Sequence, residues 1–380
     1  MILNERSGIY RDNLSGKLAY RSFVPATLPP IPPIENNDTL INLVGEANRV
    51  LGVLDTSGKF MPGLNNFIYM YTLKEALLSS QIEGTQATFD DVLNPNANEN
   101  NSQDIKEVFN YLKANEYAYG KLRELPLCNR LIRETHKVLL SGVRGQEKDP
   151  GYFRESQNWI GGTSIKNAKF IPPNHEDMLF ALDDFEKYIH NNDDVDPLIK
   201  ISLIHYQFET IHPFLDGNGR MGRLLVNLFL TENELLNFPT LYISCYLKQN
   251  RQEYYDRLME VREKGDYEQW VLFFLRAISE SGKDAINSMD EIFTLLNEDR
   301  EKLNKKIRKS KLILDLHEYL LDSPIITAQN VAKNLKISYN TALTAIKSLI
   351  DSNILITTGK EGKTPYYMYK NYVNIFRKDT

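Results

Sequence analysis

Residues 197–223 combine the pattern of a buried helix with a helix stop and a glycine-rich turn. Apolar residues recur at helical spacing over 197–211 and predict a largely buried helix: Ile201, Ile204, Phe208 and Ile211. Pro213 ends that helix, because proline has no N–H to donate and fixes its own φ. A Gly-Asn-Gly turn then leads to a second helix, which is predicted to begin near Arg220. The segment therefore predicts two consecutive helices joined by a short turn.

Helical patterns also cover most of the chain on both sides of this segment. Asp38 or Thr39 is a suitable N-cap for a first helix, and Gly84 is a suitable C-terminal stop for a second. The predicted helices before the turn cover residues 40–54, 66–84, 106–122, 128–143 and 176–192. More helices are expected to residue 282 and beyond. These patterns predict a mainly α protein.

Three segments interrupt the helical pattern. Residues 18–34 contain five prolines and predict an extended chain draped over a domain surface. Residues 92–105 are polar and predict a loop. Residues 144–176 hold two short apolar runs around a centre rich in turn residues, which predicts a β-hairpin.

The last seventy residues have a different organisation. The charged run at 298–311 predicts a connecting helix with a solvated face. After it come a helix, a turn at Lys336–Ser338, a second helix and a Gly/Lys hairpin, an order that predicts a winged-helix domain. We therefore expect an N-terminal segment over 1–100, a central helical domain over 101–290 that contains residues 197–223, and a connecting helix with a winged-helix domain over 291–380.

Composition limits the class of protein. A formal net charge of −5 gives no basic field of the kind that attracts nucleic acid or membranes. The two cysteines, Cys128 and Cys245, are far apart in the sequence, which argues against a disulfide framework or a thiolate metal site. The first residues have no apolar signal-peptide core, and no apolar stretch is long enough to span a membrane. These features predict a cytoplasmic protein without membrane association.

The sequence HPFLDGNGRMGR at 212–223 combines residue types that suit phosphate chemistry. Gly217 and Gly219 leave room for a ligand at a helix N-terminus, where backbone N–H groups and the helix dipole favour anions. Arg220 and Arg223 share one helical face, and two guanidiniums suit a polyphosphate. Asp216 would hold Mg²⁺ between itself and phosphate oxygens, and His212 could remove a hydroxyl proton. Each residue alone is more often structural, but their combination predicts a nucleotide site.

This segment resembles the Fic family signature, HPFx(D/E)GNGRxxR, at every fixed position. The run PGYFRESQNWIGG followed by FIPP resembles the flap hairpin of that family, and the proline-rich start and C-terminal winged helix resemble its larger bacterial members. The resemblance implies a helical Fic domain with a β-hairpin flap. It also implies an enzyme that transfers a nucleotide, usually AMP from ATP, to a protein hydroxyl.

The resemblance implies a role for each residue of the signature. His212 would be the general base on a Ser, Thr or Tyr hydroxyl of the target, and Asp216 would hold the Mg²⁺ that bridges the α- and β-phosphates. Arg220 and Arg223 would neutralise the β/γ end of the triphosphate. The remaining residues implied in ATP binding by this segment are Gly217, Asn218, Gly219, Met221 and Gly222.

An upstream motif implies a brake on this activity. Ser79, Glu83 and Gly84 match the inhibitory motif (S/T)xxxE(G/N) of the family. In relatives this glutamate pairs with the second arginine, here Arg223, and prevents productive seating of the γ-phosphate. A carboxylate at that place satisfies the guanidinium and repels phosphate. The sequence leaves open whether the same glutamate also supports removal of AMP from a modified target.

Further nucleotide and target contacts are predicted on two segments. Tyr254 and Tyr255 lie where relatives contact adenine and ribose, and core packing is the competing interpretation for either. Arg262 follows two turns later and could face the nucleotide. The flap residues expected against ATP and the target are Asn158, Trp159, Ile160 and Gly161.

Several alternatives stay open at the level of sequence. The transferred group could be UMP, phosphocholine or phosphate instead of AMP, and a homodimer is a further expectation from the family. Residues 311–380 hold nine Lys/Arg against six Asp/Glu, a mild excess that does not match the dense basic stripe of a strong DNA binder. A DNA-binding regulator is therefore the alternative from another class, with base contacts expected from Asn340, Thr341, Thr344 and Lys347.

Overall fold

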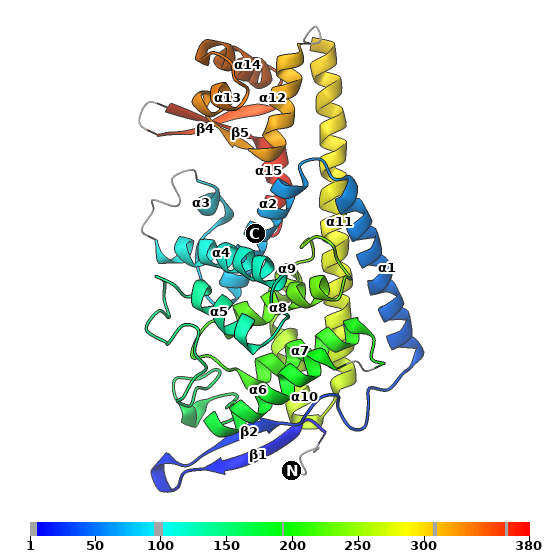
Figure 1. Ribbon diagram of the computed structural model, residues 1–380, viewed down its shortest axis with the longest axis vertical. Coiled ribbons are helices and arrows are strands. Elements are labelled where there is room, and N and C mark those ends of the chain that lie inside the picture. Colours follow the sequence, from blue (N-terminus) through cyan, green and yellow to red (C-terminus); the bar gives the residue numbers. More distant parts are fainter. Residues whose placement is uncertain (1–5, 95–101, 192–193, 307–309, 362–363) are drawn as a thin grey trace.

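A computed structural model describes residues 6–94, 102–191, 194–306, 310–361 and 364–380 of the chain. Over these residues the protein is mainly helical, with two small antiparallel sheets at opposite ends of an elongated molecule (Figure 1). A helical body lies between the sheets, and one long helix runs beside it into the C-terminal module, residues 310–380. The predicted mainly α fold is confirmed; the proposed division into three domains stays a prediction.

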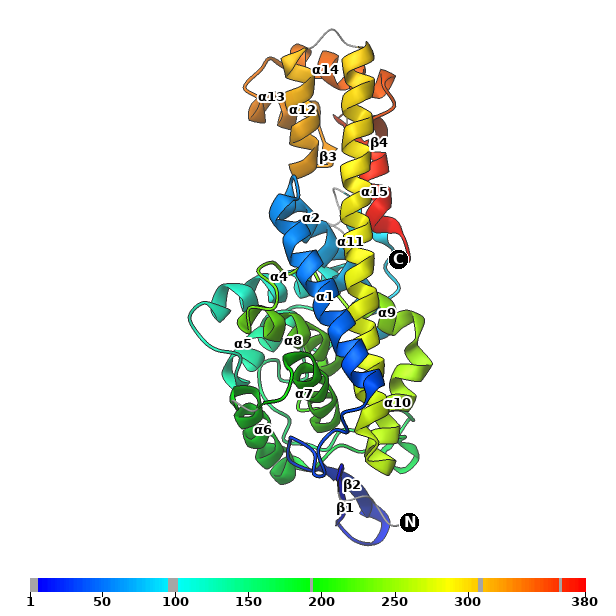
Figure 2. The same ribbon diagram turned by 90° about the vertical axis from the view of Figure 1, so that its right-hand side faces the viewer.

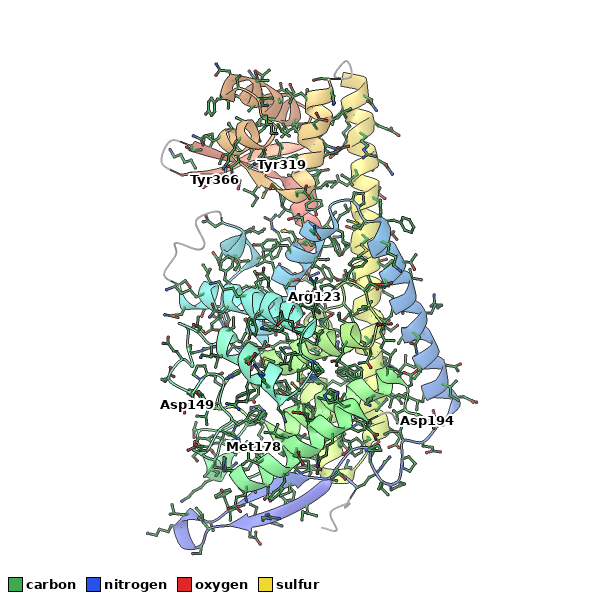
Figure 3. All side chains as sticks on the ribbon, viewed as in Figure 1. Arg123, Asp149, Met178, Asp194, Tyr319 and Tyr366 are labelled. Atoms are coloured by element: carbon green, nitrogen blue, oxygen red, sulfur yellow. The ribbon has the colours of Figure 1, made fainter. Side chains whose placement is uncertain are left out.

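Two helices form the centre of the body. α7 (Pro197–Ile211) starts with Asp196 as N-cap and proline at its first position, and every residue from Leu198 onward is buried. α8 (Asn218–Glu232) packs along α7 and is buried from Arg220 to Leu230. The surrounding helices are α2 (Leu64–Ile82), α4 (Gln103–Leu122), α5 (Asn129–Leu139) and α6 (His175–His190). Side chains fill the space between them, and Met178 of α6 is fully buried (Figure 3).

α11 (Tyr267–Lys306) is the longest element of the molecule. At 1.5 Å per residue its 40 residues extend about 60 Å. α1 (Asp38–Phe60) lies against it, and Gly282 permits the close approach, because a Cβ there would lie 2.5 Å from Val50 (Figure 2). The short helices α9 (Ser244–Gln249) and α10 (Arg251–Lys264) connect α8 with α11.

The N-terminal residues form a hairpin that the sequence analysis did not predict. β1 (Gly8–Asn13) pairs with β2 (Tyr20–Pro25), and the turn between them contains the 3-10 helix η1 (Gly16–Leu18). The prolines at 18–34 predicted an extended backbone, which β2 has, but they concealed its pairing. The N–H of Phe23 also donates to the carbonyl of Ile171, so the hairpin supports the flap segment.

The predicted flap hairpin is present in a minimal form. A single antiparallel bridge joins Ile160 to Phe170, and the loop between them contains the 3-10 helix η3 (Ile165–Asn167). Gly161 and Gly162 both have positive φ, which ends the pairing after one residue. Asp149 lies at the outer edge of the body, in the exposed loop that leads to this segment (Figure 3).

The C-terminal module has the element order that the sequence predicted. α12 (Lys311–Asp322), β3 (Ile325–Ile326), α13 (Ala328–Asn334) and α14 (Tyr339–Asp351) precede the hairpin of β4 (Leu355–Glu361) and β5 (Thr364–Tyr369). The sheet order is β3-β5-β4, and α15 (Lys370–Arg377) returns to the body. Its assignment as a winged helix stays a prediction. The four residues proposed for base contacts are all exposed on α14.

Several local expectations can be compared with the structure. Asn37, and neither Asp38 nor Thr39, caps α1, because its side chain accepts from the N–H of Leu40. The polar stretch 92–105 contains the end of α3 (Phe89–Leu93) and the start of α4, while its centre, 95–101, lies outside the described residues.

The prediction of a solvated charged run at 298–311 is wrong for Asp299. This residue is 1% exposed and accepts hydrogen bonds from Lys302 and from the hydroxyl of Tyr369. Burial occurs because the C-terminal module folds back against the end of α11. Within the described part of the chain, no helix has the length and apolar character needed to cross a bilayer.

Candidate active site at the N-terminus of α8

The loop between α7 and α8 is held in one conformation by its own residues. His212 adopts the left-handed region (φ 49°, ψ 61°), and Gly217 does the same (φ 78°) where α8 begins. The Asn218 side chain accepts from the N–H of Phe214 and donates to its carbonyl, at 2.9 and 2.8 Å. Phe214 is fully buried and anchors the loop to the core. Asn218 thus fastens the loop.

The His212 ring presents two different nitrogens. Its side chain is 20% exposed, and Nδ1 is buried without a hydrogen-bond partner, 4.0 Å from Oε2 of Glu209. Nε2 is therefore the ring nitrogen that remains for contact with a ligand. Burial, with the positive charges of Arg154 and Arg262, lowers the pKa of His212 to about 3, so the imidazole is neutral at physiological pH. A neutral imidazole is the form that a general base requires.

The flap segment fastens the backbone of this loop. Arg154 is 1% exposed, and its guanidinium donates to the carbonyls of His212 and Pro173. The Asn158 amide donates to the carbonyls of His212 (3.2 Å) and Phe214 (2.9 Å). Because His212 has a positive φ that non-glycine residues rarely adopt, these bonds explain how the strained residue is held.

His136 of α5 fastens the other side of the loop. Its ring stacks on Phe214, with centroids 3.7 Å apart and planes at 5°. Nδ1 accepts from the N–H of Gly151, so Nε2 carries the proton and donates to the carbonyl of Asp216 at 2.9 Å. One side chain therefore joins α5, the start of the flap segment and the predicted metal ligand.

Arg220 and Asp216 lie together at the mouth of α8. The Asp216 carboxylate accepts from the N–H of Gly217 and lies 3.5 Å from the Arg220 guanidinium. Arg220 is 1% exposed and also lies 3.7 Å from Glu107 of α4. Arg144 and the hydroxyl of Thr85 contact the same glutamate. Arg220 is therefore held between two carboxylates, one of which the sequence had not indicated.

Arg223 is fully engaged by the end of α2. Its Nε donates to Ser79 Oγ at 2.8 Å, and Nη2 donates to the Ser79 carbonyl and to Glu83 Oε1 at 2.9 and 2.8 Å. Gly84 ends the helix with φ 102° directly after Glu83. A Cβ on Gly219 would lie 2.2 Å from Glu83 Oε1, so this carboxylate rests on the glycine that was predicted to cradle phosphate.

The charge state of Glu83 follows from these contacts. Burial alone would raise the pKa of Glu83, but the charge and hydrogen bond of Arg223 outweigh it and hold that pKa below its usual value. Glu83 is therefore ionised at neutral pH. The ionised Glu83 carboxylate therefore lies where the sequence analysis predicted that an anion would bind.

This geometry can be compared with known proteins. Residues 126–230 match the Fic/DOC family model, and residues 41–120 match the model of the Fic/DOC family N-terminal region. These two segments of the chain belong to the Fic/DOC family. The Fic match contains the loop with His212, and the N-terminal match contains the end of α2 with Glu83, so both parts of the site lie within matched segments.

Curated relatives and solved structures agree with this membership. A probable protein adenylyltransferase of Aquifex aeolicus is 28% identical over 206 residues, 53% of this chain and 58% of the relative. The protein adenylyltransferase Fic of Aedes aegypti is 34% identical over 144 residues, 37% of this chain and 26% of the relative. The chain thus spans just over half of the first relative and about a quarter of the second.

A Fic family protein from Desulfovibrio desulfuricans has a crystal structure with the same fold. It superposes with a TM-score of 0.58 over 88% of this chain and 97% of its own, at 19% identity. At that identity the likeness shows the fold alone.

The other residues predicted for this Fic protein's nucleotide site differ in accessibility. Met221 and Tyr254 are buried in the core. The Tyr254 hydroxyl forms a hydrogen bond with His205, so Tyr254 packs as a core residue in this structure. Gly222 faces Glu209 of α7. Tyr255 is 36% exposed and Trp159 is 41% exposed, so both rings can be reached from solvent. Ile160 and Gly161 are at the flap bridge.

Arg262, which the sequence analysis named as a residue that could face the nucleotide, is buried between α10, α7 and the flap. It is 4% exposed, its guanidinium lies 3.7 Å from the centroid of the Phe170 ring, and it donates to Thr210 and to the Glu209 carbonyl. In this arrangement it joins α10 to α7 and to the flap. Its role in ATP binding stays a prediction.

The donor set at Asp216 is suited to a magnesium ion that arrives with its nucleotide. Mg²⁺ commonly takes one or two carboxylates and completes its shell with phosphate oxygens and water. Asp216 is 31% exposed at the mouth of α8, which leaves its carboxylate accessible. The described residues include no cluster of three or more His, Cys, Asp or Glu that could hold a metal without such a ligand.

Sequence reasoning missed the residues that support the site from outside the signature. These are Glu107, His136, Arg154 and Glu209, all buried ionisable side chains. Glu209 had a readable signal, because it is a carboxylate within a helix predicted to be buried, three residues before His212. Glu107 and His136 had none, since their contacts depend on the packing of α4 and α5.

Proposed function

We propose that this Fic protein transfers AMP from ATP to a Ser, Thr or Tyr hydroxyl of a protein. One observation carries the proposal: the His212 imidazole, the Gly-Asn-Gly turn and both arginines gather at the N-terminus of α8, with Glu83 on the same turn. The names of the curated relatives support the same reaction. Glu83 keeps the enzyme in a braked state.

The residues present can perform this reaction. Nε2 of His212 accepts the hydroxyl proton as the oxygen attacks the α-phosphorus, and the bond to the β,γ-pyrophosphate breaks. Arg220, Arg223 and the N–H groups of the turn would neutralise the departing pyrophosphate, because phosphoryl-type transfer depends chiefly on positioning and charge stabilisation. Asp216 would hold a Mg²⁺, which when bound supplies positive charge to the phosphate oxygens.

The brake follows from competition between anions. Glu83 lies against Gly219 and bonds to Arg223, so a γ-phosphate in the same place would lose this guanidinium and meet a negative charge. Release of Glu83 would free Arg223 for the nucleotide. We further propose that the protein acts in the cytoplasm on a protein substrate. A homodimer and DNA binding by the C-terminal module stay predictions.

The assignment of His212 as the base is tested by His212→Ala in a protein that also carries Glu83→Gly, the change that removes the proposed brake. We expect AMP incorporation to fall by roughly 10²- to 10⁴-fold, the usual contribution of a general base. Binding of ATP, measured by calorimetry, should persist. Intact mass after incubation with ATP and Mg²⁺ reports the adduct, and parallel incubations with UTP distinguish the transferred group. Undiminished labelling by the His212→Ala protein would refute the assignment.

The brake is tested by Glu83→Gly. Because a charge-assisted hydrogen bond contributes about 1.5 to 3 kcal/mol, its loss should raise the rate of self-modification roughly tenfold or more. Glu124→Gly is a matched control, since Glu124 follows the end of α4 and its ion pair with Lys121 is at the surface. Equal rates for wild type and Glu83→Gly would count against the brake.

A further inference from the structure

Glu209 is the buried carboxylate nearest to the buried side of the His212 ring. Both residues are at the end of α7, three positions apart, and Glu209 Oε2 lies 4.0 Å from His212 Nδ1. His212 Nδ1 and Glu209 Oε1 are both buried and make no hydrogen bond of good geometry, and the backbone carbonyl of Glu209 also faces the ring. Unpaired buried polar atoms are costly, so each needs an explanation: Oε1 lies against Gly222, and Oε2 is the carboxylate oxygen that faces Nδ1.

The neighbouring helix is shaped to contain this carboxylate. A Cβ on Gly222 of α8 would lie 2.3 Å from Glu209 Oε1, so only glycine leaves the space that Oε1 occupies. Gly222 was predicted to bind ATP, but its open side faces Glu209. The glutamate side chain is 9% exposed. The site therefore accommodates a carboxylate at a place closed to solvent.

The charges around His212 make such a partner chemically useful. Burial and the cations Arg154 and Arg262 lower the pKa of His212, which keeps the ring neutral but also makes it a weak base. A carboxylate behind Nδ1 would stabilise the imidazolium that forms when Nε2 takes a proton. Glu83 also favours the protonated ring, but the proposed activation removes Glu83. Glu209 would remain.

We propose that Glu209 is a positioning residue for catalysis, which holds the His212 proton on Nδ1, leaves Nε2 free to accept the hydroxyl proton, and stabilises the resulting imidazolium. This inference rests on the proposed function of His212. The 4.0 Å separation is longer than a hydrogen bond, and contacts of this kind often shorten only in the substrate complex. The acid–imidazole–hydroxyl arrangement has the same physical logic as in serine hydrolases.

Several groups set the charge of Glu209. Burial raises the pKa of Glu209 to about 7, against the positive charge of Arg223. The carboxyl group is thus partly protonated near neutral pH and becomes an effective partner as the pH rises. The charged and titratable groups that face it are Arg223 of α8, Arg262 and Tyr254 of α10, Glu83 after α2, and His212 on its own helix.

The first test is Glu209→Gln in the Glu83→Gly protein, because glutamine keeps the shape and removes the charge. We expect kcat for AMP transfer to fall roughly 10- to 100-fold, with KM for ATP changed by less than about twofold. Loss of Glu83 removes a negative charge that raises the pKa of Glu209, so in the Glu83→Gly parent kcat should rise with pH below about 7, and this rise should be absent from the glutamine variant. A fall in kcat with an unchanged pH profile would overturn the proposal.

A matched control separates this effect from a general loss of packing. Glu75→Gln changes another fully buried glutamate, which bonds to Ser244 and makes no contact with His212. In the same Glu83→Gly background it should retain the pH-dependent rise in kcat. If it loses this rise as the Glu209 variant does, the proposal fails.

The second test does not depend on activity. Nitrogen-15 spectra of the histidine rings report which nitrogen carries the proton, and His212→Ala assigns the signal among the six histidines. We expect a proton on Nδ1 of His212 in the Glu83→Gly protein and a shifted tautomer balance in Glu209→Gln. The Glu209 backbone carbonyl also faces the ring; if it holds the proton instead, the two spectra will coincide and the proposal is wrong. Absence of any AMP adduct would refute the proposed function but leave this measurement interpretable.

Discussion

At the scale of single residues, the site is built from ionisable side chains that have been removed from water. Arg154, His136 and Glu107 are each 1% exposed or less, and each contacts the active loop or its arginines. Burying such groups is unfavourable unless they are well bonded. Arg154 meets this condition through backbone carbonyls alone, and burial lowers its pKa to about 10. Their position beside the loop indicates that they fix its conformation.

His205 allows a test of this principle through pH. It is fully buried beneath α8, where Nδ1 donates to the Gly222 carbonyl and Nε2 accepts from the Tyr254 hydroxyl. Burial lowers the pKa of His205 to about 3, so the unfolded chain binds a proton below about pH 6.5 that the folded chain does not. Stability is therefore retained above pH 6.5 and falls as the pH drops. From pH 7 to 5 this one group should cost about 2 kcal/mol of unfolding free energy.

The measurement compares His205→Phe with wild type by chemical denaturation at pH 7 and pH 5. The variant should be less stable at pH 7, because the Tyr254 hydroxyl and the Gly222 carbonyl lose their partner. Between pH 7 and pH 5, however, the free energy of unfolding of the variant should fall by about 2 kcal/mol less than that of wild type. His190→Phe, at an exposed histidine, should follow wild type. Parallel losses in all three proteins would contradict the assigned burial effect.

At the scale of elements, the sequence specified helices and turns better than pairings. The end of α7, the turn and α8 followed from Pro213 and two glycines, and α8 starts two residues before the predicted Arg220. The hairpin β1–β2 was missed, because prolines at its end suggested an unpaired chain and its pairing has no strong turn signal. The flap shows the opposite error. Its two apolar runs predicted a hairpin, but consecutive glycines limit it to one bridge.

In the candidate site, too, local features were easier to predict from the sequence than contacts between distant elements. The signature residues were readable, because they are close in sequence and their combination is rare. Ser79 and Glu83 were readable only through the family motif, and the structure places them on Arg223. Glu107 and Arg154 could not be found, since each reaches the loop from an element whose position depends on the whole fold. A local pattern therefore identifies the reacting groups more readily than the groups that orient them.

At the scale of the whole molecule, α2 connects two distant parts. Its last turn carries the residues that hold Arg223, and its first turns pack on the C-terminal module (Figures 1 and 2). Asn66 donates to the Tyr372 hydroxyl, and the Phe67 ring lies 5.6 Å from that of Phe376. A rigid helix held at both ends transmits displacement from one end to the other. The C-terminal module is therefore placed to support the proposed brake.

Phe376→Ala tests this support. Phe376 is fully buried between α15 and α2, so truncation should remove about 3 to 5 kcal/mol of packing and loosen the first half of α2. Hydrogen exchange along α2 should then increase, and self-modification with AMP should rise, though less than in Glu83→Gly. Tyr69→Ala, at a half-exposed position of the same helix, should change neither measurement. In the double variant Phe376→Ala/Glu83→Gly the rate should equal that of Glu83→Gly alone, because there is no brake left to loosen. A further rise in the double variant would mean that the module acts on the site by a route other than Glu83. Faster hydrogen exchange in α2 without any rise in labelling would mean that the end of α2 holds Arg223 without help from the C-terminal module.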